Sequence, residues 1–268
     1  MLQLDQTFMF HDQKVAWGSI GAGDPLILLH GFPWSSQAWR RIAPHLSLKR
    51  QVFYFDMVGC GQSEKRDGQD VTANVQNDLL AALIEHWGLS RPQVVGHDFG
   101  GLAALRAHFI NGVEFGKLYL LDAVSVLPSG SPFFTHVMQH EVAFVGLPSY
   151  AHQALFRAYI QNAAHKPLSD EAVKIYLEPW LGKDGQSAFY RQIAQANTKY
   201  ISELQQKYAK RPFEVHLAWG ERDSFIPISQ GEELKEKLCA DTMTRIPDAG
   251  HIVHEDAPEA VVSFLLNH

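Results

Sequence analysis

The chain has 268 residues, of which 46% are hydrophobic and 19% are charged, and its formal net charge is −6 at pH 7. This balance is typical of a globular protein with one sizeable core, and the mildly acidic charge without a basic run argues against nucleic acid or anionic membrane as the main partner. Two cysteines and no C-x-x-C pair exclude a disulfide framework, so we expect a reduced, cytoplasmic setting.

Residues 1–20 predict an antiparallel hairpin, because two apolar stretches flank the polar residues at positions 11–14. Acidic and basic side chains interrupt this segment before an apolar run of signal-peptide length forms. No later run reaches the roughly 18 apolar residues that a membrane span needs. We therefore expect neither an export signal nor a membrane anchor.

Short apolar runs then alternate with longer amphipathic segments. The short runs are almost continuously apolar, as strands buried on both faces are. This alternation predicts an α/β protein with a doubly wound, mostly parallel sheet. The expected strands lie at 25–32, 51–59, 92–98, 117–124, 213–223 and 241–251, and the expected helices at about 36–48, 71–88, 99–111, 229–239 and 257–267.

The stretch 127–211 breaks this rhythm. It contains no strand-like run, and its apolar residues recur at helical spacing. We predict a helical cap here, inserted between strands 6 and 7, with a core domain made of residues 1–126 and 212–268. A cap at this place in the chain can close over the carboxyl edge of the sheet.

One strand end carries an unusual residue. The sequence from Gly96 to Gly100 reads Gly-His-Asp-Phe-Gly, which is the small-x-nucleophile-x-small pattern of a strand that turns sharply into a helix. The central residue is Asp98. A carboxylate in this position can form an ester with an sp3 carbon, so the pattern predicts an alkylating electrophile as the substrate. The alternative is a structural aspartate that caps the following helix.

Other strand ends supply partners for this carboxylate. His251 follows the last strand, and a neutral imidazole can take a proton from water near physiological pH. Asp223 ends the preceding strand and can accept the other ring N–H, which fixes the tautomer of the imidazole. Asp122 ends a further strand and is the alternative acid.

Five motifs in this order resemble the α/β-hydrolase family, and more narrowly its aspartate-nucleophile branch of epoxide hydrolases and haloalkane or haloacetate dehalogenases. They are HGFPWSSQAWR (30–40), DMVGCGQSE (56–64), GHDFGG (96–101), GERDSFIP (220–227) and AGHIVHEDAPE (249–259). The resemblance implies an oxyanion hole made by the backbone N–H groups of Phe32 and Phe99. It also implies a covalent ester that His-activated water hydrolyses, without a metal or organic cofactor.

The enzymes of this branch differ in the residues that stabilise the leaving group or bind the substrate. Haloalkane dehalogenases place Trp after the nucleophile and Asn or Trp after the HG pair, where this chain has Phe99 and Phe32. Haloacetate dehalogenases place arginines immediately after the nucleophile and one turn on, where this chain has Phe99 and Leu102. Epoxide hydrolases keep HG-x-P, as here, and use cap tyrosines as donors to the epoxide oxygen.

Tyr190 and Tyr159 are the expected donors, and His136, His140 or His152 are alternatives to Tyr159. Trp34 is expected to line the substrate pocket. The leading prediction is an epoxide hydrolase that acts on a small, apolar to moderately polar molecule as a monomer or homodimer. The alternatives are a haloalkane or haloacetate dehalogenase, an esterase or lactonase, and a non-catalytic ligand-binding protein of the same fold.

Overall fold

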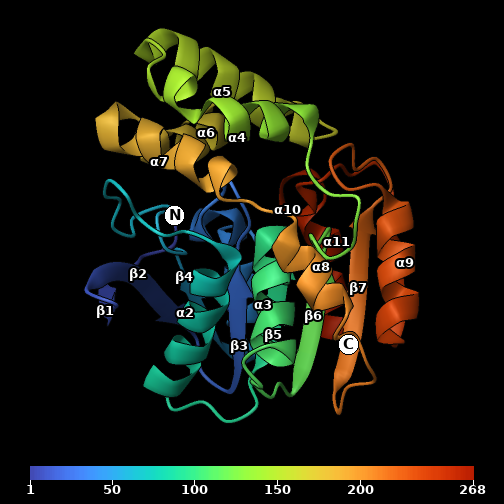
Figure 1. The fold of residues 1–268 in the computed structure, drawn as a ribbon. Helices are drawn as coiled ribbons and strands as arrows, with labels where there is room; N and C mark the ends of the chain where they lie inside the picture. Colours follow the sequence, from blue (N-terminus) through green and yellow to red (C-terminus); the bar gives the residue numbers. More distant parts are fainter.

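The computed structural model describes the whole chain, Met1–His268, around one eight-stranded sheet of order β1-β2-β4-β3-β5-β6-β7-β8 (Figure 1). The β1–β2 hairpin is antiparallel and joins the sheet at one edge, and β3 to β8 pair in parallel. The predicted fold class is confirmed. The strands are β1 (Gln6–Phe10), β2 (Gln13–Ile20), β3 (Asp24–Leu29), β4 (Arg50–Phe55), β5 (Gln93–His97), β6 (Lys117–Leu121), β7 (Glu214–Gly220) and β8 (Thr242–Ile246).

Both faces of the sheet are buried, and β3 shows why its sequence is continuously apolar. Ile27 and Leu29 point into the larger hydrophobic core, whereas Leu26 and Leu28 point into a second core on the opposite face. Successive strand side chains point to opposite faces, so a strand that is covered by helices on both sides needs apolar residues at every position.

The core helices flank the sheet on its two faces. They are η1 (Ser36–Trp39), α1 (Ala43–Leu46), α2 (Ala73–His86), α3 (Phe99–Phe109), α9 (Ile228–Leu238), α10 (Val253–Asp256) and α11 (Pro258–Asn267). The single helix expected at 36–48 is wrong, because a 3-10 turn and a short α-helix occupy that segment. Pro44 explains the break: it has no N–H to donate, and it lies in the first turn of α1.

Five helices lie between β6 and β7. They are α4 (Pro132–Val145), α5 (Ser149–Ala163), α6 (Asp170–Leu177), α7 (Gly182–Ala194) and α8 (Lys199–Gln205), with the 3-10 turn η2 (Glu178–Trp180) after α6. Helices α4 to α7 form a layer above the carboxyl ends of the strands, and α8 lies lower, beside α3 (Figure 1). The predicted cap between strands 6 and 7 is therefore present.

A buried arginine fastens α8 to the core. Arg106 of α3 is fully buried and donates to the Tyr200 carbonyl oxygen of α8 at 2.8 Å and to Asn77 Oδ1 of α2 at 2.9 Å. A buried guanidinium needs all of these acceptors, since an unpaired charge in the core costs several kcal/mol. The loop that leads from α7 into α8 is thereby held against the carboxyl edge of the sheet.

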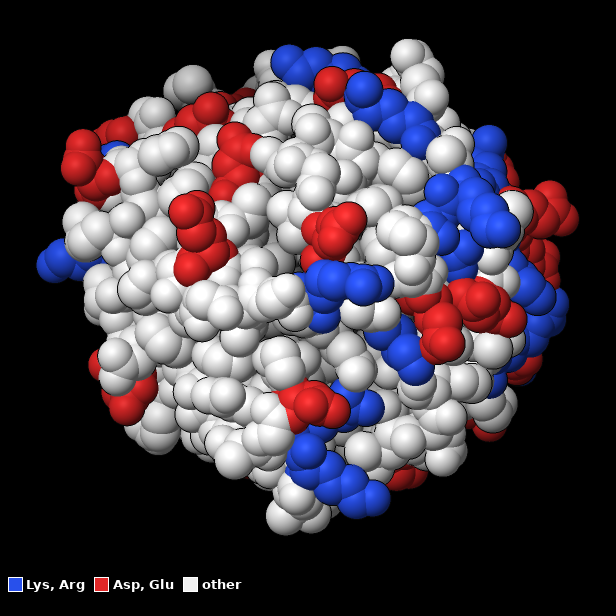
Figure 2. Space-filling model, turned by 90° about the horizontal axis from the view of Figure 1, so that it is seen from below, with Lys and Arg blue, Asp and Glu red and all other residues white.

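The surface opposite the cap mixes charges of both signs. Most basic side chains of this face lie on the right in Figure 2, with acidic ones among them, and the left half is largely uncharged with scattered acidic groups. None of the helices combines the length and apolar character that crossing a bilayer requires.

Candidate active site

Asp98 occupies the sharp turn between β5 and α3. Its backbone has φ 53° and ψ −124°, a conformation that a non-glycine residue adopts only where the surroundings hold it. Two glycines make the turn possible. A Cβ on Gly96 would lie 2.7 Å from the Gly101 Cα, and a Cβ on Gly100 would lie 2.5 Å from the His30 carbonyl oxygen. The turn raises the Asp98 side chain above the sheet edge, at the floor of a cavity.

The imidazole of His251 connects two carboxylates. Its Nε2 lies 2.7 Å from Asp98 Oδ2, and its Nδ1 lies 2.9 Å from Asp223 Oδ2. The other oxygen of Asp223 accepts hydrogen bonds from backbone N–H groups in the loop that follows β7, at 2.8 and 2.9 Å. Asp223 is therefore fixed as an acceptor, and it orients the ring of His251 toward Asp98.

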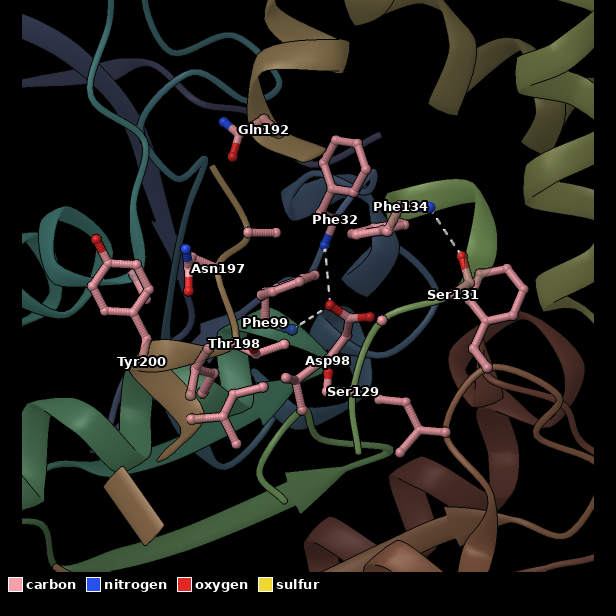
Figure 3. Close-up of a pocket in the computed structure, with 18 of the residues that line it drawn as sticks. Phe32, Asp98, Phe99, Ser129, Ser131, Phe134, Gln192, Asn197, Thr198 and Tyr200 are labelled. Carbon is pink, nitrogen blue, oxygen red and sulfur yellow. Dashed lines mark hydrogen bonds between the residues drawn. The ribbon is translucent and has the colours of Figure 1, made fainter. Parts of the chain in front are cut away.

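The remaining oxygen of Asp98 faces two backbone donors. Oδ1 accepts from the Phe32 N–H at 3.4 Å and from the Phe99 N–H, and both hydrogen bonds are drawn in Figure 3. The two predicted oxyanion-hole groups thus converge on one oxygen, while His251 contacts the other. A negative charge that develops on Oδ1 would meet fixed dipoles in a water-poor site, where they are most effective.

A cavity of about 560 Å³ opens above Asp98 between the sheet edge and the cap. Asp98 is the only acidic residue that lines it, and no Lys, Arg, His or Trp side chain contributes to the lining. The cavity extends to both sides of Asp98, toward Gln192 and Asn197 in one direction and toward Ser131 and Phe134 in the other (Figure 3).

Comparison with known proteins identifies the family. Residues 24–258 match the family model of the alpha/beta hydrolase fold. The chain belongs to this family. A crystal structure of an alpha/beta hydrolase fold protein from Burkholderia ambifaria is 49% identical, has a TM-score of 0.98 and matches over 100% of this chain and 99% of that one.

Two curated relatives carry more specific names. A soluble epoxide hydrolase from Corynebacterium sp. (strain C12) is 31% identical over 130 residues, which is 47% of this chain and 44% of the relative. Haloalkane dehalogenase 2 from Mycobacterium tuberculosis (strain ATCC 25618 / H37Rv) is 24% identical over 270 residues, or 92% of this chain and 88% of the relative. The protein is a hydrolase of the α/β-hydrolase family.

The charge of His251 depends on its two neighbours. Burial alone would lower the pKa of this imidazole, but the carboxylates of Asp223 and Asp98 outweigh burial and raise the pKa well above its usual value. The two neighbouring carboxylates therefore favour the protonated, cationic form of the ring. If Asp98 were esterified, one of the two charges would disappear, and the pKa of His251 would fall.

Asp122, the alternative acid, occupies a different environment in the hydrolase. It is fully buried at the end of β6, where its Oδ1 accepts from the Gly220 N–H at 2.8 Å, and it forms no hydrogen bond with His251. Burial, followed by the charge of Asp223, raises the pKa of Asp122 well above its usual value. Its surroundings thus favour the protonated form of Asp122, and Asp223 is the carboxylate that contacts the imidazole.

The backbone of His251 is anchored on both sides. Its N–H donates to the Ala163 carbonyl oxygen at the end of cap helix α5, at 2.8 Å. Its carbonyl oxygen accepts from Nε2 of His97, the residue before Asp98, also at 2.8 Å. Burial, with a smaller effect of His251, lowers the pKa of His97 to about 4, so His97 remains a neutral donor. The cap and the strand that bears Asp98 therefore both position the imidazole.

The two predicted tyrosines have different surroundings. Tyr159 of α5 lines the cavity, and its ring lies 5.2 Å from that of Phe225, which in turn stacks on His251 at 5.2 Å. Burial and the charge of Asp98 raise the pKa of Tyr159 well above its usual value, so its hydroxyl keeps its proton. This hydroxyl has no hydrogen-bond partner in the protein and remains available to a bound molecule.

Tyr190 and Trp34 do not line the cavity, so their predicted places in the pocket are wrong. The Tyr190 hydroxyl lies 3.0 Å from His152 Nδ1, inside the cap. Trp34 is fully buried, and its ring packs edge-on against Tyr176. Both ring nitrogens of His152 have partners, Nδ1 with the Tyr190 hydroxyl and Nε2 with the Trp180 carbonyl oxygen. Neither His136 nor His140 lines the cavity.

No motif in the sequence predicts the amide side chains that line the cavity. Gln76, Gln192, Gln195 and Asn197 line it together with Asn162 and Gln230. These residues come from the core helices, the cap and the loop after α7, and they share no motif. Only the closure of the cap over the sheet brings them together.

The neutral state of His97 predicts a loss of stability in acid. The unfolded chain binds a proton on this ring near pH 6.5, whereas the folded protein binds it only near 4. The free energy of unfolding is therefore unaffected by this group above pH 6.5. It decreases as the pH falls from 6.5 to 4, and the protonation of His97 in the unfolded chain accounts for roughly 3 kcal/mol of that decrease. Urea unfolding as a function of pH measures the decline. His97→Gln keeps a donor but does not titrate, so it should flatten the curve, and an equally steep curve would contradict the assignment.

Proposed function

We propose that this hydrolase opens epoxides through a covalent ester on Asp98. The observation that carries the proposal is the division of the Asp98 carboxylate between two sets of partners, with backbone N–H groups on Oδ1 and His251 on Oδ2. The Tyr159 hydroxyl in the same cavity supports an epoxide, because ring opening produces an alkoxide that must be protonated.

In the first step, Asp98 Oδ2 attacks a ring carbon and the carbon–oxygen bond of the epoxide breaks. The electron pair moves to the epoxide oxygen, which takes the proton of the Tyr159 hydroxyl. Because the ester is uncharged, the pKa of His251 then falls, and its proton can pass to the tyrosinate of Tyr159. This transfer restores the phenol and leaves His251 neutral.

In the second step, neutral His251 takes a proton from water as the water attacks Cγ of Asp98. The negative charge develops on Oδ1, where the N–H groups of Phe32 and Phe99 stabilise it. When the intermediate collapses, the leaving alkoxide takes the proton from His251 and departs as the diol. The carboxylic acid left on Asp98 returns its proton to His251, which regenerates the starting ion pair.

A dehalogenase is the main competing function, because haloalkane dehalogenase 2 is similar to this chain over 88% of its own length. The composition of the cavity speaks against it. By the family resemblance, haloalkane dehalogenases bind the halide with indole N–H groups, and haloacetate dehalogenases bind the substrate carboxylate with arginines. Neither Trp nor Arg lines this cavity. Diol formed from styrene oxide or 1,2-epoxyalkanes without halide release from haloalkanes or haloacetates would separate the two functions.

Replacement of the base should stop the reaction after the first step. His251→Gln cannot deprotonate water, so we expect kcat to fall by about a thousandfold and the ester to accumulate. Mass spectrometry of the peptide that contains Asp98 would show the added mass of the epoxide. Asp98→Asn, which lacks the nucleophile, should show no adduct. Slow turnover by His251→Gln without any adduct would contradict the covalent route.

Loss of the Tyr159 hydroxyl should affect the first step alone. Tyr159→Phe removes the proton donor, and we expect kcat for epoxides to fall by about a hundredfold. Tyr190→Phe is the matched control, because its hydroxyl bonds to His152 outside the cavity and should change kcat little. Single-turnover rates of ester formation measure both effects. If Tyr190→Phe proved the slower variant, the assignment of the donor would be wrong.

A further inference from the structure

The arm of the cavity that contains Gln192 has a polar character that the proposed reaction does not use. Gln192 lies in cap helix α7, on the side of Asp98 opposite Ser131 and Phe134 (Figure 3). The arm continues past Asn197 and Thr198, which are exposed at the surface. A substrate whose reacting carbon lies at Asp98 can therefore extend a substituent along this arm.

The orientation of the Gln192 amide is fixed by its neighbours. Its Nε2 donates to the Val58 carbonyl oxygen at 2.9 Å and contacts Cys60 Sγ at 3.4 Å. The Val58 backbone is itself held by Gln76, which accepts from its N–H and donates to its oxygen, each at 3.1 Å. Because both acceptors face Nε2, the amide oxygen of Gln192 points away from them.

This oxygen has no donor in the protein, unlike the other glutamines of the same arm. Gln76 uses both its amide atoms on Val58. Gln195 also uses both, since its oxygen accepts from the Val71 N–H and its nitrogen donates to the Gln69 carbonyl oxygen, each at 2.9 Å. Gln192 Oε1 is thus a preorganised acceptor without a partner, and preorganisation reduces the cost of binding.

The charge of the cavity limits what the arm can bind. No cation lines it, and Asp98 contributes the only carboxylate. An anionic substituent would meet that carboxylate and the amide oxygen with no cation in the lining to offset the repulsion, which is unfavourable. An uncharged group with an O–H or N–H would instead satisfy the free acceptor.

We propose that Gln192 selects uncharged substrates that carry a hydrogen-bond donor, such as a hydroxyl group, on the substituent that extends along this arm. The proposal deepens the proposed function and rests on it for the nature of the reacting group. Gln192 acts here as a specificity-determining residue, since its oxygen binds a part of the substrate remote from Asp98.

A series of matched substrates tests the proposal. Terminal epoxides over a range of chain lengths would carry a hydroxyl, a methoxy, a methyl or a carboxylate group at the far end. The methoxy group accepts but cannot donate, so the ratio of kcat/KM for hydroxyl to methoxy isolates the donor. At the best chain length we expect a ratio of about five in the wild-type protein, the contribution of one hydrogen bond, and the carboxylate should be the poorest substrate. A ratio near one at every length would overturn the proposal.

The variant Gln192→Leu should bring this ratio close to one. Gln186→Leu is the matched control, because Gln186 lies on the same helix and its Nε2 also donates to two acceptors, the Val145 and Leu147 carbonyl oxygens, but it does not line the cavity. Its ratio should stay at the wild-type value. The ratio does not depend on the fraction of folded enzyme, so a loss of stability cannot imitate the result. An unchanged ratio in Gln192→Leu would overturn the proposal.

Chloroalkanes with the same end groups separate this proposal from the proposed function. If epoxides are not opened but halide is released with a hydroxyl preference that Gln192→Leu removes, the site at Gln192 stands and the epoxide assignment falls. If epoxides are opened equally well with hydroxyl and methoxy end groups, the epoxide assignment stands and the site at Gln192 falls. If neither series reacts, calorimetric titration with the corresponding alcohols and methyl ethers decides: tighter binding of the alcohol, lost in Gln192→Leu, supports the site, and equal binding overturns it.

Discussion

The hydrogen bond between His251 Nε2 and Asp98 Oδ2, 2.7 Å long, joins parts of the chain that are 153 residues apart. Its formation requires the strained turn at Asp98, the loop after β8 and the carboxylate of Asp223 to meet at one edge of the sheet. Parallel strands make this possible, because their carboxyl ends all lie at that edge. The backbone of His251 is further held by His97 and by Ala163 of the cap. The cap therefore positions His251 as well as covering the cavity.

The same ion pair accounts for the order of the proposed steps. Asp223 and, to a smaller extent, Asp98 raise the pKa of His251, so both carboxylates favour the protonated imidazole before the ester forms. In the proposed mechanism, esterification removes the charge of Asp98 and lowers the pKa of His251, which favours the neutral imidazole that the second step needs. The cavity around the pair is otherwise free of charged side chains, which leaves the substrate to be bound by aromatic faces, amide groups and the hydroxyl groups of tyrosine, serine and threonine. Such a lining suits uncharged molecules.

The sequence was sufficient for features that depend on local chemistry. The small residues around Asp98, the apolar strands and the order of the motifs predicted the fold, because each of these reflects a backbone requirement that few residues satisfy. The apolar residues at 36–48 recur at helical spacing and therefore predicted one continuous helix. Pro44 is the local signal for the break between η1 and α1. The expected strands at 51–59 and 213–223 ran past the real ends of β4 at Phe55 and of β7 at Gly220. The residues that follow both strands belong to loops of the site, where Met57 lines the cavity and Asp223 contacts His251.

The cap was harder to predict, because its residues act through packing rather than through motifs. Tyr159 and Tyr190 both lie on helices beside aromatic residues, and periodicity cannot tell which face of a cap helix points to the cavity and which points into the cap. The choice depends on how α5 and α7 pack, which buries Tyr190 against His152. The free oxygen of Gln192 depends likewise on the backbone of Val58, which lies in a distant loop of the core.

The central claim is that Asp98 itself becomes the ester, and isotope labelling tests it most directly. A single turnover of styrene oxide by excess enzyme in water enriched in the heavy oxygen isotope should place the label in the Asp98 carboxylate and leave the new diol oxygen unlabelled. This follows because water attacks Cγ of Asp98 and the diol receives an oxygen that Asp98 held before. Label in the diol with an unlabelled Asp98 would contradict the account, since water would then have attacked the epoxide directly.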